Sequence, residues 1–168
     1  LDSVNIKKAL ITGVAGQDGA YLAKLLIKKN YKVYGIIRAK QKNNLWRLNK
    51  LKIKKNIKLL RTDLNNYEDI AKLIKKEKFK EVYNLAATSS VGESFKKPRE
   101  YLINNSEIVV NILDSIRLFS NKTKFFQVSS SEMYGNNSQK TIGLKSDPKP
   151  INPYAVSKLN SQNITKIY

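Results

Sequence analysis

The sequence contains no cysteine and no histidine among its 168 residues. The absence of cysteine excludes disulfide bonds and thiolate metal sites, and the absence of histidine removes the commonest metal ligand and general base. We therefore expect no metal ion, and any catalysis must use hydroxyl, carboxylate, tyrosine and lysine side chains.

Long apolar runs are also missing. The longest, such as residues 9–12 and 108–113, are far shorter than the roughly 20 residues that cross a bilayer, and no charged-then-apolar leader precedes the first predicted strand. The sequence therefore predicts a cytoplasmic protein with no membrane partner. Because the chain starts at Leu1 and reaches Tyr168 inside a predicted helix, we expect it to be part of a longer protein.

Acidic residues are scarce: 13 Asp and Glu stand against 32 Lys and Arg, which gives a formal net charge of +19. The lysines are spread through nearly every segment, and no basic helix, aromatic platform or finger motif accompanies them. This spread indicates lysines on every solvated face and predicts no specific nucleic-acid partner. A basic nucleic-acid binder remains a rival hypothesis.

Short apolar runs alternate with longer amphipathic ones, the pattern of βαβ units. The predicted strands are residues 7–12, 32–37, 57–61, 81–85 and 124–128, and the predicted helices are 18–29, 67–77, 98–119 and a last one starting at 153. Asn152 suits the N-cap of that last helix, and a polar loop at 136–152 precedes it. The expected fold is α/β, a Rossmann-like doubly wound parallel sheet.

A glycine-rich turn follows the first strand. Gly13, Gly16 and Gly19 stand three residues apart between a strand and a helix, where they permit a tight turn, close approach of a pyrophosphate and close helix packing. The helix start then offers unpaired N–H groups to the phosphates. The predicted cofactor contacts here are Gly13, Ala15, Gly16, Gln17, Asp18 and Gly19. The alternative is an ordinary strand-to-helix turn.

Three further strand ends belong to the same predicted cofactor site. Arg38 and Lys40 follow the second strand, where a carboxylate would favour NAD, so the basic residues favour NADP. Asp63 follows the third strand and could accept a hydrogen bond from the adenine amino group. Small side chains follow the fourth strand at 84–89. The predicted contacts are Arg38, Asp63, Leu64, Leu85, Ala86, Ala87 and Ser89.

A candidate catalytic set lies in the last quarter of the chain. Tyr154 and Lys158 are one helical turn apart, so a cation can stabilise the phenolate that exchanges a proton with a sugar hydroxyl. Ser130 and Glu132 follow the fifth strand and should emerge at the nicotinamide edge of the sheet. A polar strand end with serine caps is the alternative for that segment.

These motifs together resemble the extended short-chain dehydrogenase/reductase family. The resemblance rests on the Thr-Gly-x-x-Gly-x-x-Gly turn at 12–19, the Asn-Leu-Ala-Ala segment at 84–87, the Ser-Ser-Ser-Glu segment at 129–132 and Tyr154-x-x-x-Lys158. Within this family, Gly-Gln-Asp-Gly at 16–19, Trp-Arg-Leu at 46–48 and Ser-Glu-Met-Tyr-Gly at 131–135 are similar to the branch of GDP-mannose 4,6-dehydratases.

The resemblance implies a redox-neutral, NADP-dependent dehydration of GDP-mannose to GDP-4-keto-6-deoxymannose, a step of deoxysugar biosynthesis. It implies that Tyr154 is the C4 base, that Ser130 binds the C4 oxygen, that Glu132 removes the C5 proton, and that Lys158 holds the nicotinamide ribose. The implied substrate contacts are Ser89, Ser130, Glu132 and Tyr154. Residues 5–168 would form the NAD(P)-binding domain, with the substrate domain largely beyond Tyr168, and the full-length protein would be a homo-oligomer.

The chain departs from the family at three positions. Ser130 stands where the family has Thr, Thr88 where it has Gln or Met, and Ser90 where some members have His. Rival interpretations are a reductase, epimerase or decarboxylase on the same scaffold, or a non-catalytic NADP-binding module. A glutamate two residues after the catalytic hydroxyl favours chemistry that moves a C5 proton, and a binding module has no need of the full catalytic set.

Overall fold

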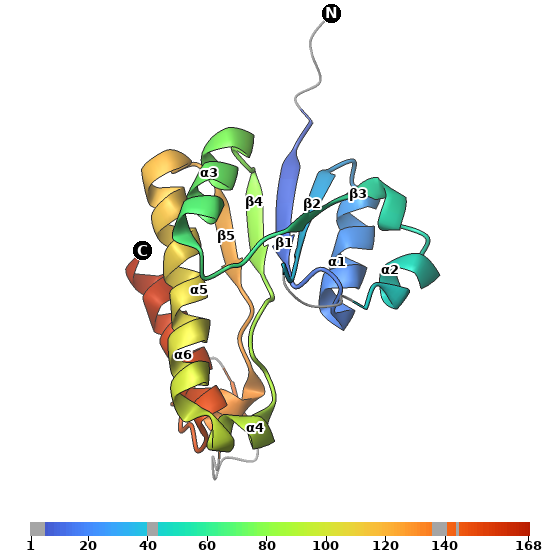
Figure 1. Cartoon of the computed structure of the whole chain (residues 1–168). Coiled ribbons are helices and arrows are strands. Elements are labelled where there is room, and N and C mark those ends of the chain that lie inside the picture. The colour runs from blue at the N-terminus through green and yellow to red at the C-terminus, as the bar shows by residue number, and fades with distance from the viewer. Residues whose placement is uncertain (1–5, 40–43, 136–140, 144) are drawn as a thin grey trace, which may run out of the picture. The chain divides into compact units, whose positions relative to one another are not determined.

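Five strands form one sheet in the computed structural model, which describes residues 6–39, 44–135, 141–143 and 145–168. The strands are β1 (Lys8–Thr12), β2 (Lys32–Ile37), β3 (Ile57–Arg61), β4 (Glu81–Asn84) and β5 (Lys124–Gln127). Their order in the sheet is β3-β2-β1-β4-β5, the order of a dinucleotide-binding fold. All five arrows point the same way in Figure 1, and the predicted doubly wound parallel sheet is confirmed.

Helices connect the strands. They are α1 (Gln17–Lys28), α2 (Trp46–Lys50), η1 (Lys54–Asn56), α3 (Tyr67–Glu77), α4 (Val91–Lys96), α5 (Pro98–Phe119), η2 (Ser131–Tyr134) and α6 (Pro153–Ile167). The four helices expected from the sequence are confirmed, whereas the short helices α2 and α4 were not expected. In the described part of the chain, no helix is both long and apolar enough to cross a membrane.

The chain divides into two compact units. The first comprises the described residues up to Ala86 together with Asn111–Phe126, and the second comprises Ala87–Val110 and Gln127–Tyr168. Helix α5 contributes residues to both. The first unit therefore holds the glycine-rich turn, and the second holds the Ser130, Glu132, Tyr154 and Lys158 set.

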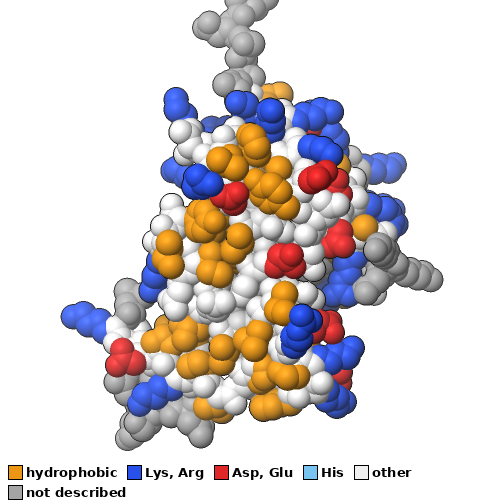
Figure 2. Space-filling view, turned by 60° about the vertical axis from the view of Figure 1, so that its left-hand side comes forward, with side chains coloured by type: hydrophobic (Ala, Val, Ile, Leu, Met, Phe, Trp, Pro, Cys, Tyr) orange, Lys and Arg blue, Asp and Glu red, His pale blue; other side chains and the backbone are white. Residues whose placement is uncertain are grey.

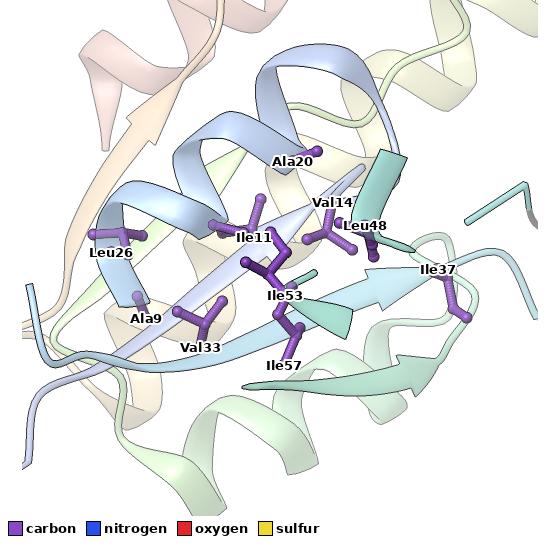
Figure 3. Packing of buried hydrophobic residues seen from close by; sticks show 11 residues of the cluster. Ala9, Ile11, Val14, Ala20, Leu26, Val33, Ile37, Leu48, Ile53 and Ile57 are labelled. Carbon is purple, nitrogen blue, oxygen red and sulfur yellow. The ribbon is translucent and has the colours of Figure 1, made fainter. Parts of the chain in front are cut away.

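The core of the first unit lies on both faces of the sheet. In Figure 3, Ala9 and Ile11 of β1 pack with Leu26 of α1 and Leu48 of α2 on one face, and all four side chains are buried. Because side chains alternate along a strand, the buried Leu10 points to the opposite face. A strand that is buried on both faces has a continuous apolar run in its sequence, as β1 does.

Strand register sets which residues meet at the carboxyl edge of the sheet. Thr12 pairs with Ile36 of β2 and with Asn84 of β4, and Ile37 of β2 pairs with Arg61 of β3. The segments that follow β1, β2, β3 and β4 therefore all leave the sheet at this edge, which is where ligands bind in folds of this kind.

Candidate cofactor and catalytic site

Gly13 and Gly19 of the glycine-rich turn are packed too tightly to carry side chains. Gly13 has φ of +68°, and a Cβ built on it would lie 3.1 Å from the backbone N of Ala86. A Cβ on Gly19 would lie 2.8 Å from the Cα of Val14, closer than such atoms can approach. Helix α1 therefore starts directly against the turn, and β4 runs directly beside it.

Thr12 joins the ends of β1 and β4. Its hydroxyl donates to Oδ1 of Asn84 at 2.6 Å and accepts from the N–H groups of Leu85 at 3.1 Å and Ala86 at 3.0 Å. These two N–H groups are thereby occupied, so Leu85 and Ala86 can meet a ligand only through their carbonyls and side chains. Both residues are half-buried.

Helix α1 begins without a side-chain cap. Its N-cap residue is Gly16, whereas α3 and α6 are capped by the side chains of Asn66 and Asn152. Within the described residues, no acceptor binds the N–H groups of Gln17 and its two successors. A helix start with free N–H groups and a positive dipole end is a site for an anion such as pyrophosphate. Gln17 and Asp18 are exposed, and Ala15 is half-buried.

The ends of β2 and β3 carry the predicted adenosine contacts. Arg38 is exposed directly after β2, while Lys40 lies outside the described residues. One oxygen of Asp63 accepts from the N–H of Asn65 at 3.1 Å, and the carbonyl of Leu64 accepts from Nδ2 of Asn111 at 3.1 Å. Asp63 is exposed, so its carboxylate is accessible to a ligand.

In the second unit, Glu132 is held by the residue that starts helix α6. Nδ2 of Asn152 donates to Oε2 of Glu132 at 3.0 Å, while Oδ1 of Asn152 caps α6 by accepting from the N–H of Ala155 at 2.7 Å. Ser130 caps η2 by accepting from the N–H of Glu132 at 3.3 Å. The two ends of the Asn152 amide thus tie Glu132 to the helix that carries Tyr154.

Lys158 is almost completely buried, with 2% of its surface exposed. Its Nζ donates to the carbonyl of Val128 at 2.6 Å, and burial lowers its pKa to about 8. Tyr154 lies one turn earlier on α6 and is half-buried, so a ligand can reach it. The lysine is therefore fixed at the end of β5 with its charge only partly compensated.

Asn105 of α5 links the segment after β4 to helix α6. Its Oδ1 accepts from the N–H of Thr88 at 2.9 Å, and its Nδ2 donates to the carbonyl of Thr88 at 3.1 Å and to Oγ of Ser157 at 2.9 Å. The chain after β4 is thereby linked through Asn105 to Ser157, the residue that precedes Lys158 on α6. Ala87 is half-buried and Ser89 is exposed on this segment.

The structure brings the predicted residues together in two groups. The first unit places the glycine-rich turn against Leu85 and Ala86, and the second places Ser130, Glu132, Tyr154 and Lys158 on or beside α6 and η2. The sequence interpretation missed two residues that hold these groups in place, Thr12 and Asn105, and it missed the second role of Asn152. The predicted N-cap role of Asn152 is confirmed.

The family model and the curated relatives that match this chain belong to one family. The family model described as GDP-mannose 4,6 dehydratase matches residues 10–168. The GDP-mannose 4,6-dehydratase of Vibrio cholerae is 38% identical over 173 residues, which covers 98% of this chain and 46% of that protein. The human GDP-mannose 4,6 dehydratase is 36% identical over 160 residues, covering 90% and 43%. The chain thus spans about half the length of these relatives.

Solved structures show the same fold. The UDP-Glc/GlcNAc 4-epimerase of Campylobacter jejuni superposes with a TM-score of 0.86 at 26% identity, covering 96% of this chain and 48% of that one. The UDP-glucose 4-epimerase of Brucella ovis, solved in complex with NAD, superposes with a TM-score of 0.85 at 26% identity, covering 96% and 47%. With the family model matching nearly its whole length, the chain belongs to the GDP-mannose 4,6-dehydratase family.

Proposed function

We propose that this chain is the NADP-binding domain, residues 5–168, of a nucleotide-sugar 4,6-dehydratase that converts GDP-mannose to GDP-4-keto-6-deoxymannose. The full-length protein is proposed to be a cytoplasmic homo-oligomer. The observation that carries the proposal is the Asn152–Glu132 hydrogen bond. It ties the Glu132 carboxylate of η2 to the N-cap of α6, the helix that carries Tyr154 and Lys158, and chemistry that moves a carbon-bound proton needs such a carboxylate.

The first unit has features that suit a dinucleotide. The uncapped start of α1 offers N–H donors to a pyrophosphate, and the glycines of the turn before it leave room for one. Arg38 would bind a ribose 2′-phosphate, and Asp63 would accept from the adenine amino group. The NAD bound to the Brucella epimerase is consistent with a nicotinamide cofactor at this edge, and Arg38 favours the phosphorylated form.

The residues of the second unit would divide the reaction between them. When bound, NADP would supply the hydride-accepting and hydride-donating chemistry of a redox-neutral reaction in which C4 is first oxidised and C6 is finally reduced. Tyr154 would remove the proton of the C4 hydroxyl, while Ser130 would donate a hydrogen bond to the C4 oxygen. The C4 ketone makes the C5 proton acidic, and Glu132 would remove it and pass it to the departing C6 hydroxyl, which leaves as water. The proton taken up by Tyr154 would balance the proton that C5 regains as hydride adds to C6.

Lys158 and Asn152 would act through their neighbours. Lys158 would hold the nicotinamide ribose and stabilise the Tyr154 phenolate by its charge. Asn152 would keep Glu132 in position while capping the helix that carries Tyr154. The 4-epimerases among the solved relatives use the same scaffold, so the held Glu132 is the feature that favours dehydration over epimerisation.

Cofactor titration of this chain tests the first half of the proposal. We expect NADP⁺ to bind more tightly than NAD⁺ in calorimetry. The Arg38→Ala variant should weaken NADP⁺ binding by about tenfold to a hundredfold, because a charge-assisted hydrogen bond contributes about 1.5–3 kcal/mol. Arg99→Ala, another exposed arginine, is the matched control and should leave the affinity unchanged. A folded chain that binds neither cofactor contradicts the proposal.

The second half needs a protein completed to the length of its relatives. In that protein, Glu132→Gln should abolish the dehydration of GDP-mannose and leave NADP⁺ binding intact, because the amide is isosteric but cannot take the C5 proton. Dehydration retained in this variant would rule out the role assigned to Glu132.

A further inference from the structure

A cavity of about 900 Å³ lies at the amino ends of the strands of the first unit, the edge opposite the glycine-rich turn. Its walls are the start of β1, the chain between α3 and β4, and the turn between α5 and β5. With β1 five residues long, the cavity lies roughly 16 Å from the turn. Figure 2 shows Lys and Arg side chains around apolar ones at this end (top of Figure 2).

The lining of this cavity is strongly basic. Six lining residues are cationic, Lys7, Lys8, Lys78, Lys80, Arg117 and Lys122, and Glu77 is the single acidic one. Both oxygens of Glu77 are already engaged: Oε2 accepts from Lys8 at 2.9 Å and from Tyr34 at 2.7 Å, and Oε1 accepts from Lys58 at 3.4 Å. Among the described lining residues, the single carboxylate is therefore neutralised by its partners.

Four of the six cations, Lys7 among them, form no ion pair with a described carboxylate. Arg117 is bound to Asp114 at 2.6 Å, but no described carboxylate forms an ion pair with Lys78, Lys80 or Lys122. All three side chains are exposed at the cavity. Like charges gathered on one concave surface raise the local positive potential and attract anions.

The loops that carry these lysines are fastened together. Oγ1 of Thr123 donates to the carbonyl of Phe79 at 2.6 Å, and the N–H of Lys124 donates to the carbonyl of Lys80 at 3.0 Å. The loop with Lys78 and Lys80 and the turn with Lys122 are thus held in a fixed relation. A binding surface that is fixed in advance loses less freedom when a ligand binds.

We propose that Lys78, Lys80 and Lys122 form a second ligand site, one for a small anion with several phosphate groups. The volume is within the range of small-molecule sites. The uncompensated cations are all lysines, which bind phosphate as point charges, and several point charges on one concave surface suit an anion that carries several charged groups. The site is independent of the proposed dehydratase function, because it lies at the other edge of the sheet.

Calorimetry with inorganic tripolyphosphate tests this site on the chain itself. In the presence of saturating NADP⁺, we expect one tripolyphosphate per chain. The triple variant Lys78→Gln, Lys80→Gln, Lys122→Gln should weaken this binding by about tenfold or more, because it removes three charge-assisted contacts. The natural ligand could be a nucleotide or an inorganic polyphosphate, and a titration with ATP distinguishes the two. ATP that binds more tightly than tripolyphosphate indicates a nucleotide, and equal affinity indicates an inorganic polyphosphate.

The matched control removes three lysines that do not line the cavity, Lys28→Gln, Lys54→Gln and Lys55→Gln, all exposed. It changes the net charge by the same amount and should bind tripolyphosphate as the parent does. Equal weakening in both triple variants would overturn the proposal in favour of non-specific attraction. So would the absence of binding, or binding that NADP⁺ abolishes, which would place the anion at the glycine-rich turn.

Discussion

At the scale of single residues, the burial of the Lys158 ammonium group costs the candidate site folding free energy. A buried lysine loses the hydration of its charge, and one carbonyl at 2.6 Å replaces only part of it. The fall of its pKa from 10.5 to about 8 corresponds to about 3 kcal/mol of differential interaction. A buried ammonium group with a strongly lowered pKa, on the same helix as Tyr154, is typical of a functional residue.

Replacing Lys158 with methionine should therefore stabilise the chain at neutral pH. The parent binds a proton at Lys158 more weakly when folded, so its free energy of unfolding rises as the pH increases from about 8 towards 10.5. Lys158→Met removes this cost of about 3 kcal/mol and loses the bond to Val128, which leaves a net gain of about 1–2 kcal/mol at pH 7.

Urea unfolding at pH 7 and pH 9.5 measures both effects. The advantage of the variant should shrink by about 2 kcal/mol at the higher pH, because much of the cost has disappeared from the parent by then. An advantage that is independent of pH would mean that burial does not perturb this lysine. The same variant should bind NADP⁺ more weakly if Lys158 contacts the nicotinamide ribose.

The candidate chemical groups were predictable from the sequence because each follows a predicted strand or lies on a predicted helix. The residues that position them were not. Thr12 and Asn84 are 72 positions apart and meet only through strand register, and Asn105 and Ser157 are 52 positions apart. No local pattern reports contacts of that separation. Asn152 was predictable as a helix cap, but its bond to Glu132 needs the fold.

At the scale of secondary-structure elements, the long helices and the strands were predictable, and the short helices were not. Helix α3 has eleven residues, an N-cap Asn66 and a regular apolar face, whereas α2 has five residues and α4 has six. A helix of one to two turns is too short to show a 3.6-residue period. Burial of Leu48 in the cluster beside Val14 (Figure 3) is what orders α2.

The contact between α1 and β1 gives a prediction at this scale. Gly19→Ala would place a Cβ 2.8 Å from the Cα of Val14, and backbone atoms cannot yield as a flexible side chain would. We expect a loss of about 1–3 kcal/mol in thermal or urea unfolding, the usual cost of overpacking. Because the helix must shift away from the turn, NADP⁺ binding should weaken as well.

Gly92→Ala is the matched control, since the same substitution in α4 meets no atom within 4 Å. Alanine is the better helix former, so this variant should be unchanged or more stable by up to about 1 kcal/mol. Equal destabilisation by the two substitutions would show that close packing at Gly19 is not the cause.

At the scale of the whole molecule, charge is the feature that neither the fold nor the proposed reaction uses. The formal net charge is +19, and four of the six ion pairs among the described residues join exposed or half-buried side chains only three or four positions apart in the sequence. Pairs of this kind contribute little to stability. The exception is the buried Glu77. Burial alone would raise its pKa, but the hydrogen bonds from Lys8, Tyr34 and Lys58 lower this pKa to about 2.

Repulsion among the lysines should make the stability of the chain depend on salt. Folding brings the positive charges closer together, so the folded state suffers more repulsion than the unfolded chain. Raising KCl from 0.05 to 0.5 M shortens the screening length to well below 10 Å, and we expect the melting temperature to rise by roughly 5 °C, equivalent to about 2 kcal/mol. Thermal melts followed by circular dichroism measure this directly.

The control variant without Lys28, Lys54 and Lys55 should gain less from salt, because it starts with less repulsion. A melting temperature that falls with KCl would show that attraction between opposite charges dominates, and the excess of lysine would then carry no energetic cost to explain.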